Sequence, residues 1–212
     1  MKPAALRVLI LATVALAFTF GFRPGLAASS PAALLQRMTA VNPNLQSYTA
    51  SLHVVIAFHT LPLSPTLDGN YYFKKPDKQA VVFDTVPVLA QQFQKIYPKI
   101  DPPSTWPEVY DVSILTSGGG TTTLRLTPKR SGRVAHLDVT VDDASAMPSS
   151  YTWTYVDGGT VTFGQEYVRV GGNYLVRAQN GKVNLPSYNA DVTTTFSNFQ
   201  LNVPVPDTVF GT

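Results

Sequence analysis

Apolar and polar residues alternate over most of the chain, and this pattern predicts a protein built largely from strands. The clearest case is 47–59, in which Tyr48 and every second residue after it as far as Phe58 is apolar. A repeat of two places alternate side chains on opposite faces of a strand, so one face is expected to be buried. Further strands are expected at 67–74, 79–84, 109–116, 121–127, 134–142, 150–156, 160–167, 174–179, 182–185 and 190–201.

Short segments rich in Gly, Asn, Asp and Pro separate these strands and are typical of tight turns. The segments lie at 118–120, 128–132, 157–159, 171–173 and 180–181. Strands joined by short turns form an antiparallel meander, and a meander of many strands tends to curl around its own apolar face. Because the pattern contains no internal repeat and no long linker, we expect a single domain over 28–212.

Two segments change to the repeat of a helix. Residues 31–41 carry an apolar stripe and follow two serines that can cap a helix. Residues 87–100 carry a second apolar stripe, with glutamines and lysines on the opposite face. The second stripe consists of Leu89, Phe93, Ile96 and Tyr97.

The N-terminal segment has the features of a secretion signal. Lys2 and Arg7 flank the start of an apolar run over 8–22, which is shorter than the roughly 20 residues that a membrane span needs. Small residues at Gly25 and Ala27 fit a signal-peptidase site, so we expect residues 1–27 to be removed after export. An uncleaved membrane anchor is the alternative. Both readings deliver the rest of the chain across a membrane.

Composition narrows the chemistry of the protein. The chain of 212 residues contains no Cys, which excludes disulfides, thiolate metal sites, Fe–S clusters and Cys nucleophiles. Without Lys2, Arg7 and Arg23, it carries 13 basic and 13 acidic residues. Because phosphate binding depends on clustered Lys and Arg, this balance argues against a nucleic acid as the main partner.

Sequence motifs of enzymes are missing as well, including the nucleophile elbow, the zinc-protease helix, the P-loop and the dinucleotide fingerprint. We therefore expect no catalytic site, no metal and no cofactor. His53 and His59 are separated by roughly 20 Å along one strand, too far to share a metal. The third histidine, His136, is expected on the solvent face. An enzyme would need polar groups to converge in a pocket, for instance His136 with Asp138 or Arg125.

The most informative feature is distributed over the apolar faces of many strands. A wide sheet curled around one amphipathic helix closes either over packed side chains or over an empty space, and the pattern alone leaves both possibilities open. The candidate cavity residues are Leu52, Val54, Ile56, Phe58, Tyr71, Phe73, Val81, Phe83, Leu124, Leu126, Leu137, Val139, Tyr151, Trp153, Tyr155 and Phe163.

Several short segments follow one another in a recognisable order. They are 44–52 (NLQSYTASL), 67–77 (LDGNYYFKKPD), 124–129 (LRLTPK), 137–142 (LDVTVD) and 196–210 (FSNFQLNVPVPDTVF). Together with the expected helices, this order resembles the bacterial outer-membrane lipoprotein-sorting family, the LolA/LolB-like carriers, over nearly all of the chain after residue 27. Each segment alone is a weak signal, and their order carries the resemblance.

The resemblance implies a fold that is mainly β with an α lid. In that fold, a curved antiparallel incomplete β-barrel encloses an apolar cavity covered by helices. The candidate cavity residues would then hold acyl chains, and Leu89, Phe93, Ile96 and Tyr97 would form the inner face of the lid. Carriers of the family often place an Arg before the Pro of a Lys-Arg-Pro-like turn, where it fastens the lid. Lys75 takes that position here.

The function implied is that of an exported, non-enzymatic carrier in the periplasm that moves lipoproteins or lipids between membranes. Its partners would be acyl chains and transfer proteins of the inner and outer membranes, with transient membrane contact only. The alternative is an envelope-stress sensor or protein-interaction module with the same fold, a filled core and no transported ligand.

Overall fold

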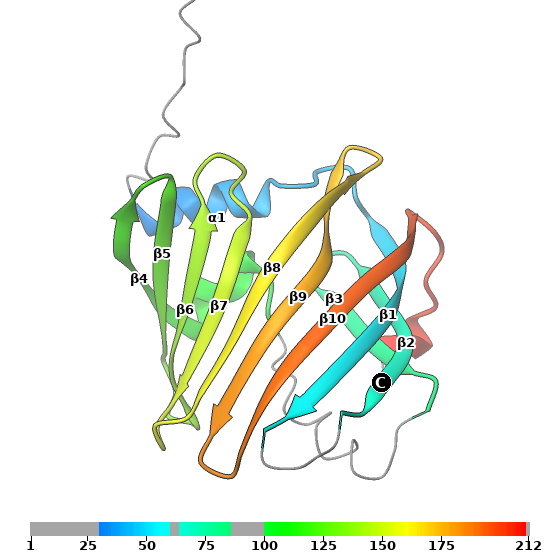
Figure 1. The fold of residues 1–212 in the computed structure, drawn as a ribbon. Coiled ribbons are helices and arrows are strands. Elements are labelled where there is room, and N and C mark those ends of the chain that lie inside the picture. Colours follow the sequence, from blue (N-terminus) through cyan, green and yellow to red (C-terminus); the bar gives the residue numbers. More distant parts are fainter. Residues whose placement is uncertain (1–29, 60–63, 86–99, 211–212) are drawn as a thin grey trace, which may run out of the picture.

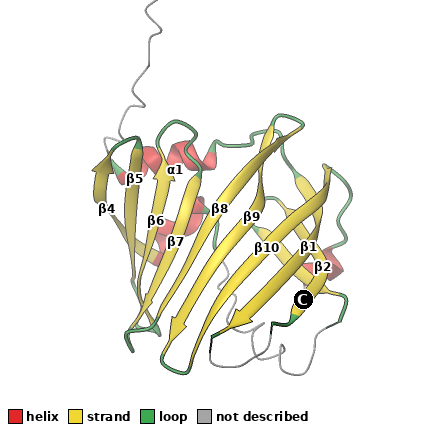
Figure 2. Cartoon of the chain, in the orientation of Figure 1, coloured by secondary structure: helices red, strands yellow, loops and turns green. Residues whose placement is uncertain are grey.

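The architecture is a single curved sheet, seen in a computed structural model that describes residues 30–59, 64–85 and 100–210. Within these residues, ten antiparallel strands are ordered β3-β2-β1-β10-β9-β8-β7-β6-β5-β4. The sheet curls without closing, and β3 and β4 are its two edges (Figures 1 and 2). The fold expected from the resemblance, a curved and incomplete antiparallel barrel, is therefore confirmed for the sheet.

Strands that are neighbours in the sheet are also consecutive in the chain, with one exception. The first strand, β1, lies beside the last strand, β10. With the exception discussed below, each predicted strand overlaps one observed strand. The observed bounds are β1 (Ser47–Phe58), β2 (Thr66–Lys74), β3 (Lys78–Phe83), β4 (Tyr110–Gly118), β5 (Thr121–Pro128), β6 (Val134–Asp142), β7 (Pro148–Tyr155), β8 (Thr160–Val170), β9 (Asn173–Leu185) and β10 (Tyr188–Leu201).

The prediction of two strands divided by a turn at Asn180 and Gly181 is wrong, because β9 runs unbroken through both residues. Gly181 lies opposite Phe163 of β8, and a Cβ atom at this position would approach the Phe163 ring to 2.5 Å. The glycine therefore makes room for a neighbouring ring, which is a common reason for glycine inside a strand. The turn between β9 and β10 instead contains Pro186 and Ser187.

The helices of the described residues are short. They are α1 (Pro31–Thr39), the 3-10 helix η1 (Pro103–Thr105), α3 (Trp106–Val109) and the 3-10 helix η2 (Asp207–Phe210). Helix α1 begins where Ser30 Oγ accepts a hydrogen bond from the Ala33 backbone N–H at 3.2 Å, as the sequence predicted for a serine cap. No helix in the described ranges is long and apolar enough to cross a membrane. The helix expected over 87–100 lies outside them, apart from Ile100.

One half of the sheet packs against α1 and α3. The inward side chains of β5 and β6, such as Leu124 and Val139, are fully buried in one apolar cluster with Leu34 of α1 and Trp106 of α3. Trp106 also donates its Nε1–H to the Asp101 carbonyl at 2.8 Å, which fixes the indole in place. We call β4, β5, β6 and β7, with α1, η1 and α3, the filled half. Strands β1, β2, β3, β8, β9 and β10 form the hollow half.

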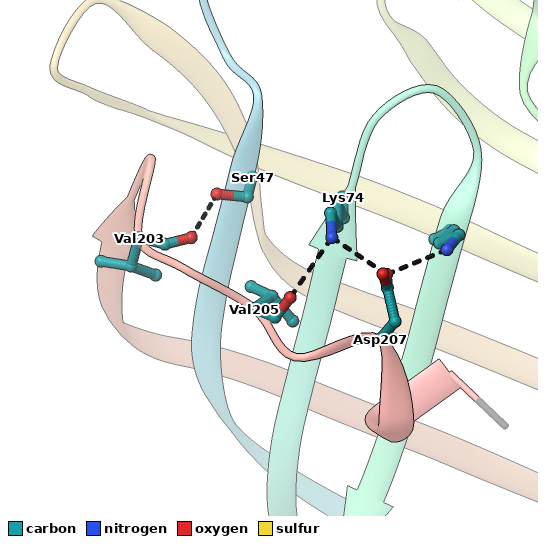
Figure 3. A network of polar contacts seen from close by, with 6 residues as sticks. Ser47, Lys74, Val203, Val205 and Asp207 are labelled. Atoms are coloured by element: carbon teal, nitrogen blue, oxygen red, sulfur yellow. Dashed lines mark hydrogen bonds and ion pairs between the residues drawn. The ribbon is translucent and has the colours of Figure 1, made fainter.

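The C-terminal segment after β10 crosses the ends of β1 and β2 and reaches β3. We call residues 202–210 the C-terminal strap. Ser47 Oγ donates to the Val203 carbonyl at 2.6 Å, and the Asp207 carboxylate lies 2.9 Å from both Lys74 and Lys78 (Figure 3). The strap therefore ties together three neighbouring strands at one end of the hollow half.

Candidate functional site

The concave side of the hollow half contains a cavity of about 870 Å³. This volume lies within the range of small-molecule sites, roughly 300–1,000 Å³. Alternation of side chains along each strand brings apolar residues to this face, and the strong curl of the sheet keeps opposite walls apart. The deeper apolar lining includes Leu52, Val54, Ile56, Leu67, Val161, Val183, Val192 and Phe196.

The sequence-predicted cavity residues fall into two groups. Those that line the cavity come mainly from the hollow half: Leu52, Val54, Ile56, Phe58, Tyr71, Phe73, Val81, Phe83, Tyr151 and Phe163. Those that do not line it come from β5, β6 and β7: Leu124, Leu126, Leu137, Val139, Trp153 and Tyr155. Both groups face the concave side, so alternation alone does not separate them.

The second group packs into solid core because the helices lie opposite it. Leu124, Leu126 and Val139 have no exposed surface and belong to the cluster that includes Trp106 of α3. Trp153 stacks on Tyr151 with 5.8 Å between ring centroids and meets the edge of Phe163 at 6.1 Å. These aromatic contacts form the boundary between the filled half and the cavity.

The structure adds lining residues that the sequence analysis did not select. They lie chiefly on β8, β9 and β10 and include Gln165, Tyr167, Leu175, Val176, Gln179, Val183, Ala190, Val192 and Phe196. The turn that was wrongly predicted at Asn180 divided β9 into two short strands, so the inward-facing residues of β9 were not recognised as one row. On β10, the alternation of Ala190, Val192 and Phe196 was a usable signal, because these buried positions are separated by exposed ones.

Polar groups inside the cavity are mostly tyrosines and glutamines. The Tyr71 hydroxyl donates to Gln79 Oε1 at 3.0 Å. The Tyr167 hydroxyl lies 2.6 Å from the Pro148 carbonyl oxygen and also contacts the side-chain oxygen of Gln165. Burial raises the pKa of Tyr167, as it does for Tyr48 and Tyr151, so these hydroxyls stay neutral at physiological pH.

Charged side chains are sparse in the described lining, where Lys75 and Asp101 are the two examples. Lys75 Nζ donates to the carbonyls of Asn42 and Pro43, at 3.3 and 3.0 Å. It thus fastens the turn between β2 and β3 to the connection between α1 and β1. Its expected role in holding a lid stays a prediction, because the lid residues Leu89, Phe93, Ile96 and Tyr97 lie outside the described residues.

The three histidines lie away from the cavity and pair with aspartates. His53 Nδ1 is 2.7 Å from Asp68, and His59 Nε2 is 2.9 Å from Asp191; the side chains of both histidines are about half exposed. The cluster considered for an enzyme does form, because Arg125 makes a bidentate pair with Asp138 at 2.8 and 2.7 Å, and His136 lies 3.7 Å from Asp138. It contributes nothing to the cavity lining.

In the part of the chain that the structure describes, no group of three His, Cys, Asp or Glu residues is placed to hold a metal ion. The site that remains is the cavity. Its walls offer a large apolar contact area, several neutral hydrogen-bonding groups and little charge. Such an arrangement can enclose and orient an apolar molecule.

Comparison of the sequence with known proteins identifies no family: no protein-family model matches it, and no curated protein does. Comparison of the structure gives a different result. A LolA superfamily protein from Nitrosomonas europaea aligns with a TM-score of 0.61 at 13% identity, over 87% of this chain and 99% of that one.

Two further solved structures are similar to a comparable degree. A proposed outer membrane lipoprotein-sorting protein domain from Vibrio parahaemolyticus has a TM-score of 0.66 at 12% identity, over 84% of this chain and 94% of its own. A DUF1329 family protein from Desulfovibrio piger has a TM-score of 0.65 at 14% identity, over 85% and 95% of the two chains. At these identities the likeness establishes the fold alone. The chain described here therefore has a LolA-like fold.

Proposed function

We propose that this protein is an exported, non-enzymatic binder of acyl chains that carries lipids or lipoproteins between membranes. The observation that carries the proposal is the apolar cavity of about 870 Å³ on the concave face of a LolA-like sheet. The description of the Vibrio parahaemolyticus domain as lipoprotein-sorting agrees with this function. We place the protein in the periplasm, with its signal peptide cleaved near Ala27.

The energetics of burial favour an acyl chain as the occupant. Each methylene that leaves water contributes about 0.8 kcal/mol, so a long chain supplies roughly 10 kcal/mol before the cost of ordering it. The deeper walls, such as Val54 and Val192, offer no ionic partner that would favour a charged ligand over a hydrocarbon. A binding role also fits the position of the Arg125–Asp138–His136 cluster, which lies outside the cavity.

The alternative of an interaction module with a filled core is less well supported. Its central feature would be dense packing on the whole concave face, as in β5 and β6. The hollow half instead retains space between the side chains of β1, β2, β8, β9 and β10. A protein partner is nevertheless a distinct outcome in the experiment that follows.

The test uses the full-length gene, so that the protein is exported by its own N-terminal segment and then purified. Organic extraction and mass spectrometry should identify about one acyl lipid or lipoprotein per chain. The variant Phe73→Asp places a carboxylate on the cavity wall and should remove this lipid. Leu115→Asp is the matched control, because Leu115 is 44% exposed and lies on β4, outside the cavity.

Three results would count against the carrier function. The first is an empty extract together with no binding of the apolar fluorophore N-phenyl-1-naphthylamine. The second is an equal lipid content in Phe73→Asp and Leu115→Asp, provided that both variants melt cooperatively. The third is a stoichiometric protein partner on the lipid-free chain, which would favour the interaction module.

A further inference from the structure

The cavity has a charged end and an apolar end. Strand β2 runs along one wall, with Leu67 in the lining at one end and Lys75, which directly follows the strand, in the lining at the other. At about 3.3 Å per residue, these two positions are roughly 26 Å apart along the strand. Leu67 is 4% exposed and lies opposite Val54 of β1, another apolar lining residue. A molecule that lies along β2 therefore meets hydrocarbon at one end and an ammonium group at the other.

The Lys75 ammonium is held in place by neutral groups. Its Nζ donates to the carbonyls of Asn42 and Pro43, at 3.3 and 3.0 Å. Asn42 is itself fixed, because its side-chain amide exchanges two hydrogen bonds, at 2.8 and 2.7 Å, with the backbone carbonyl and N–H of Tyr174 on β9. The ammonium is therefore positioned at this end of the cavity before a ligand arrives, which lowers the cost of ordering it on binding.

These carbonyl partners leave the positive charge of Lys75 without a compensating negative charge. An ammonium has three N–H donors, and the two carbonyls use two of them. Among the residues that the structure describes, no carboxylate lies within ion-pair distance of Lys75 Nζ. The neighbouring lysines differ, because Lys74 and Lys78 both lie 2.9 Å from the Asp207 carboxylate. Lys75 thus has both a donor and a full charge to offer to a ligand.

The acidic residue of the described lining, Asp101, lies toward the filled half. Its backbone carbonyl accepts the Trp106 indole N–H, and its carboxylate adds to the effect of burial in raising the pKa of Tyr110. The carboxylate is therefore beside the start of β4. Two further carboxylates, Asp77 in the turn between β2 and β3 and Asp207 in the C-terminal strap, are exposed and contribute nothing to the lining.

A cation at the end of an apolar wall favours an amphiphile with an anionic head. Hydrogen bonds from an ammonium to an anionic oxygen are shorter than neutral ones and about twice as strong. Lys75 is half-buried, so solvent screens such a pair less than it screens a pair at the open surface. A head group beside Nζ also leaves the hydrocarbon chain free to follow the apolar residues of β2.

We propose that Lys75 binds the anionic head group of an acyl ligand at one end of the cavity, while the hydrocarbon chain lies along β2 toward Leu67. This inference rests on the proposed function, because it assigns a ligand class and an orientation to the same cavity. It also gives Lys75 a role that differs from fastening a lid. A lid fastener would affect all ligands alike, whereas a head-group partner affects only charged ones.

The test is displacement of N-phenyl-1-naphthylamine from the exported, delipidated full chain at pH 8. Laurate and 1-dodecanol are the competitors, because they have the same number of carbons and differ in the charge of the head. Lys75→Met removes the charge and keeps an unbranched side chain. It should weaken laurate about tenfold and leave 1-dodecanol and the probe within about twofold, since a hydrogen bond between charged groups contributes about this factor.

Three further variants separate charge from structure. Lys75→Arg keeps the charge and should retain most of the laurate affinity. Lys75→Gln removes the charge but keeps N–H donors for the Pro43 carbonyl, so it gives the same comparison if Lys75→Met does not fold. Lys129→Met is the matched control, because Lys129 Nζ also donates to a backbone carbonyl, that of Pro107 at 2.6 Å, but lies outside the cavity. It should change neither competitor.

The outcomes distinguish this inference from the function on which it rests. An equal loss of laurate and 1-dodecanol in the uncharged Lys75 variants would overturn the head-group role and favour lid fastening. An unchanged ratio of the two would also overturn it, while acyl-chain binding would stand. Failure of the wild-type chain to bind the probe or either competitor would overturn the proposed function itself. Near-ultraviolet circular dichroism checks that each variant is folded.

Discussion

Single residues determine how much space the curved sheet leaves empty, and Gly181 is the clearest example. Its missing side chain lets the Phe163 ring lie close to the β9 backbone, where a Cβ would be only 2.5 Å from the ring. Phe163 then meets Trp153 edge-on at 6.1 Å. A glycine in β9 therefore controls the position of an aromatic wall of the cavity.

Replacing this glycine should show the effect directly. Gly181→Ala should destabilise the protein by about 1–3 kcal/mol, because the added methyl overpacks against the Phe163 ring. The midpoint and slope of urea unfolding measure this change. Gly164→Ala is the matched control, since a Cβ there would find its nearest contact at 3.8 Å, from the Asn180 carbonyl oxygen. Equal effects of the two substitutions would contradict the close packing described.

Single residues also show how far alternation along a strand can locate the cavity wall. Leu52, Val54 and Ile56 were selected from alternation in β1, and the structure places them on the cavity wall. Leu124 and Val139 were selected by the same pattern, yet they are core residues. Tertiary packing decides whether an inward side chain contacts a helix or lines a cavity. Alternation along a strand shows only which face the side chain is on.

At the scale of elements, local signals predicted most of the sheet. Strand lengths, turns and the capped helix α1 follow from alternation, Gly-rich turns and a serine cap, all of which act over a few residues. The failure at β9 has the same origin, because an Asn-Gly pair is a strong hairpin signal. In β9 that preference was overridden by the need for a glycine opposite Phe163. The pairing of β1 with β10 had no local signal, since its partners are far apart in the sequence.

The C-terminal strap is held by apolar burial and by ion pairs, and the contributions of the two to stability can be measured separately. Val205 is 6% exposed, whereas the Asp207 ion pairs with Lys74 and Lys78 lie at the surface. Val205→Ala should cost about 1.5 kcal/mol from two buried methyl groups. Asp207→Asn should cost less than Val205→Ala, because exposed ion pairs are weak.

Urea unfolding of these two strap variants in 0.05 and 0.5 M salt provides the measurement. The loss in Asp207→Asn should shrink at the higher salt concentration, since screening already weakens the wild-type ion pairs. The loss in Val205→Ala should persist. A larger loss in Asp207→Asn than in Val205→Ala would show that the strap is held by charge and not by apolar burial.

At the scale of the whole molecule, the two halves of the sheet should respond differently to added volume. Val192→Phe extends a side chain into the cavity, so it should leave stability within about 1 kcal/mol but weaken binding of N-phenyl-1-naphthylamine. Val139→Phe inserts the same extra volume into the filled half, where Val139 has no exposed surface. It should cost about 1–3 kcal/mol and leave probe affinity unchanged in the folded fraction.

Thermal unfolding and probe titration of both variants give the comparison. Destabilisation of Val192→Phe to the level of Val139→Phe would indicate that the concave side is packed throughout. Retention of full probe affinity in Val192→Phe would place the binding site elsewhere on the molecule.

The neighbouring positions of β1 and β10 have a consequence for the order of folding. Tyr48 pairs with Leu201, across almost the entire length of the described chain, whereas β4 to β10 are joined to their neighbours by short turns. Loop closure over long separations is entropically costly, and contacts between distant residues slow folding. We therefore expect β4 to β10 to form the nucleus and β1 to β3 to dock last. The final docking step would complete the wall of the cavity, so the binding site would come into existence only at the end of folding.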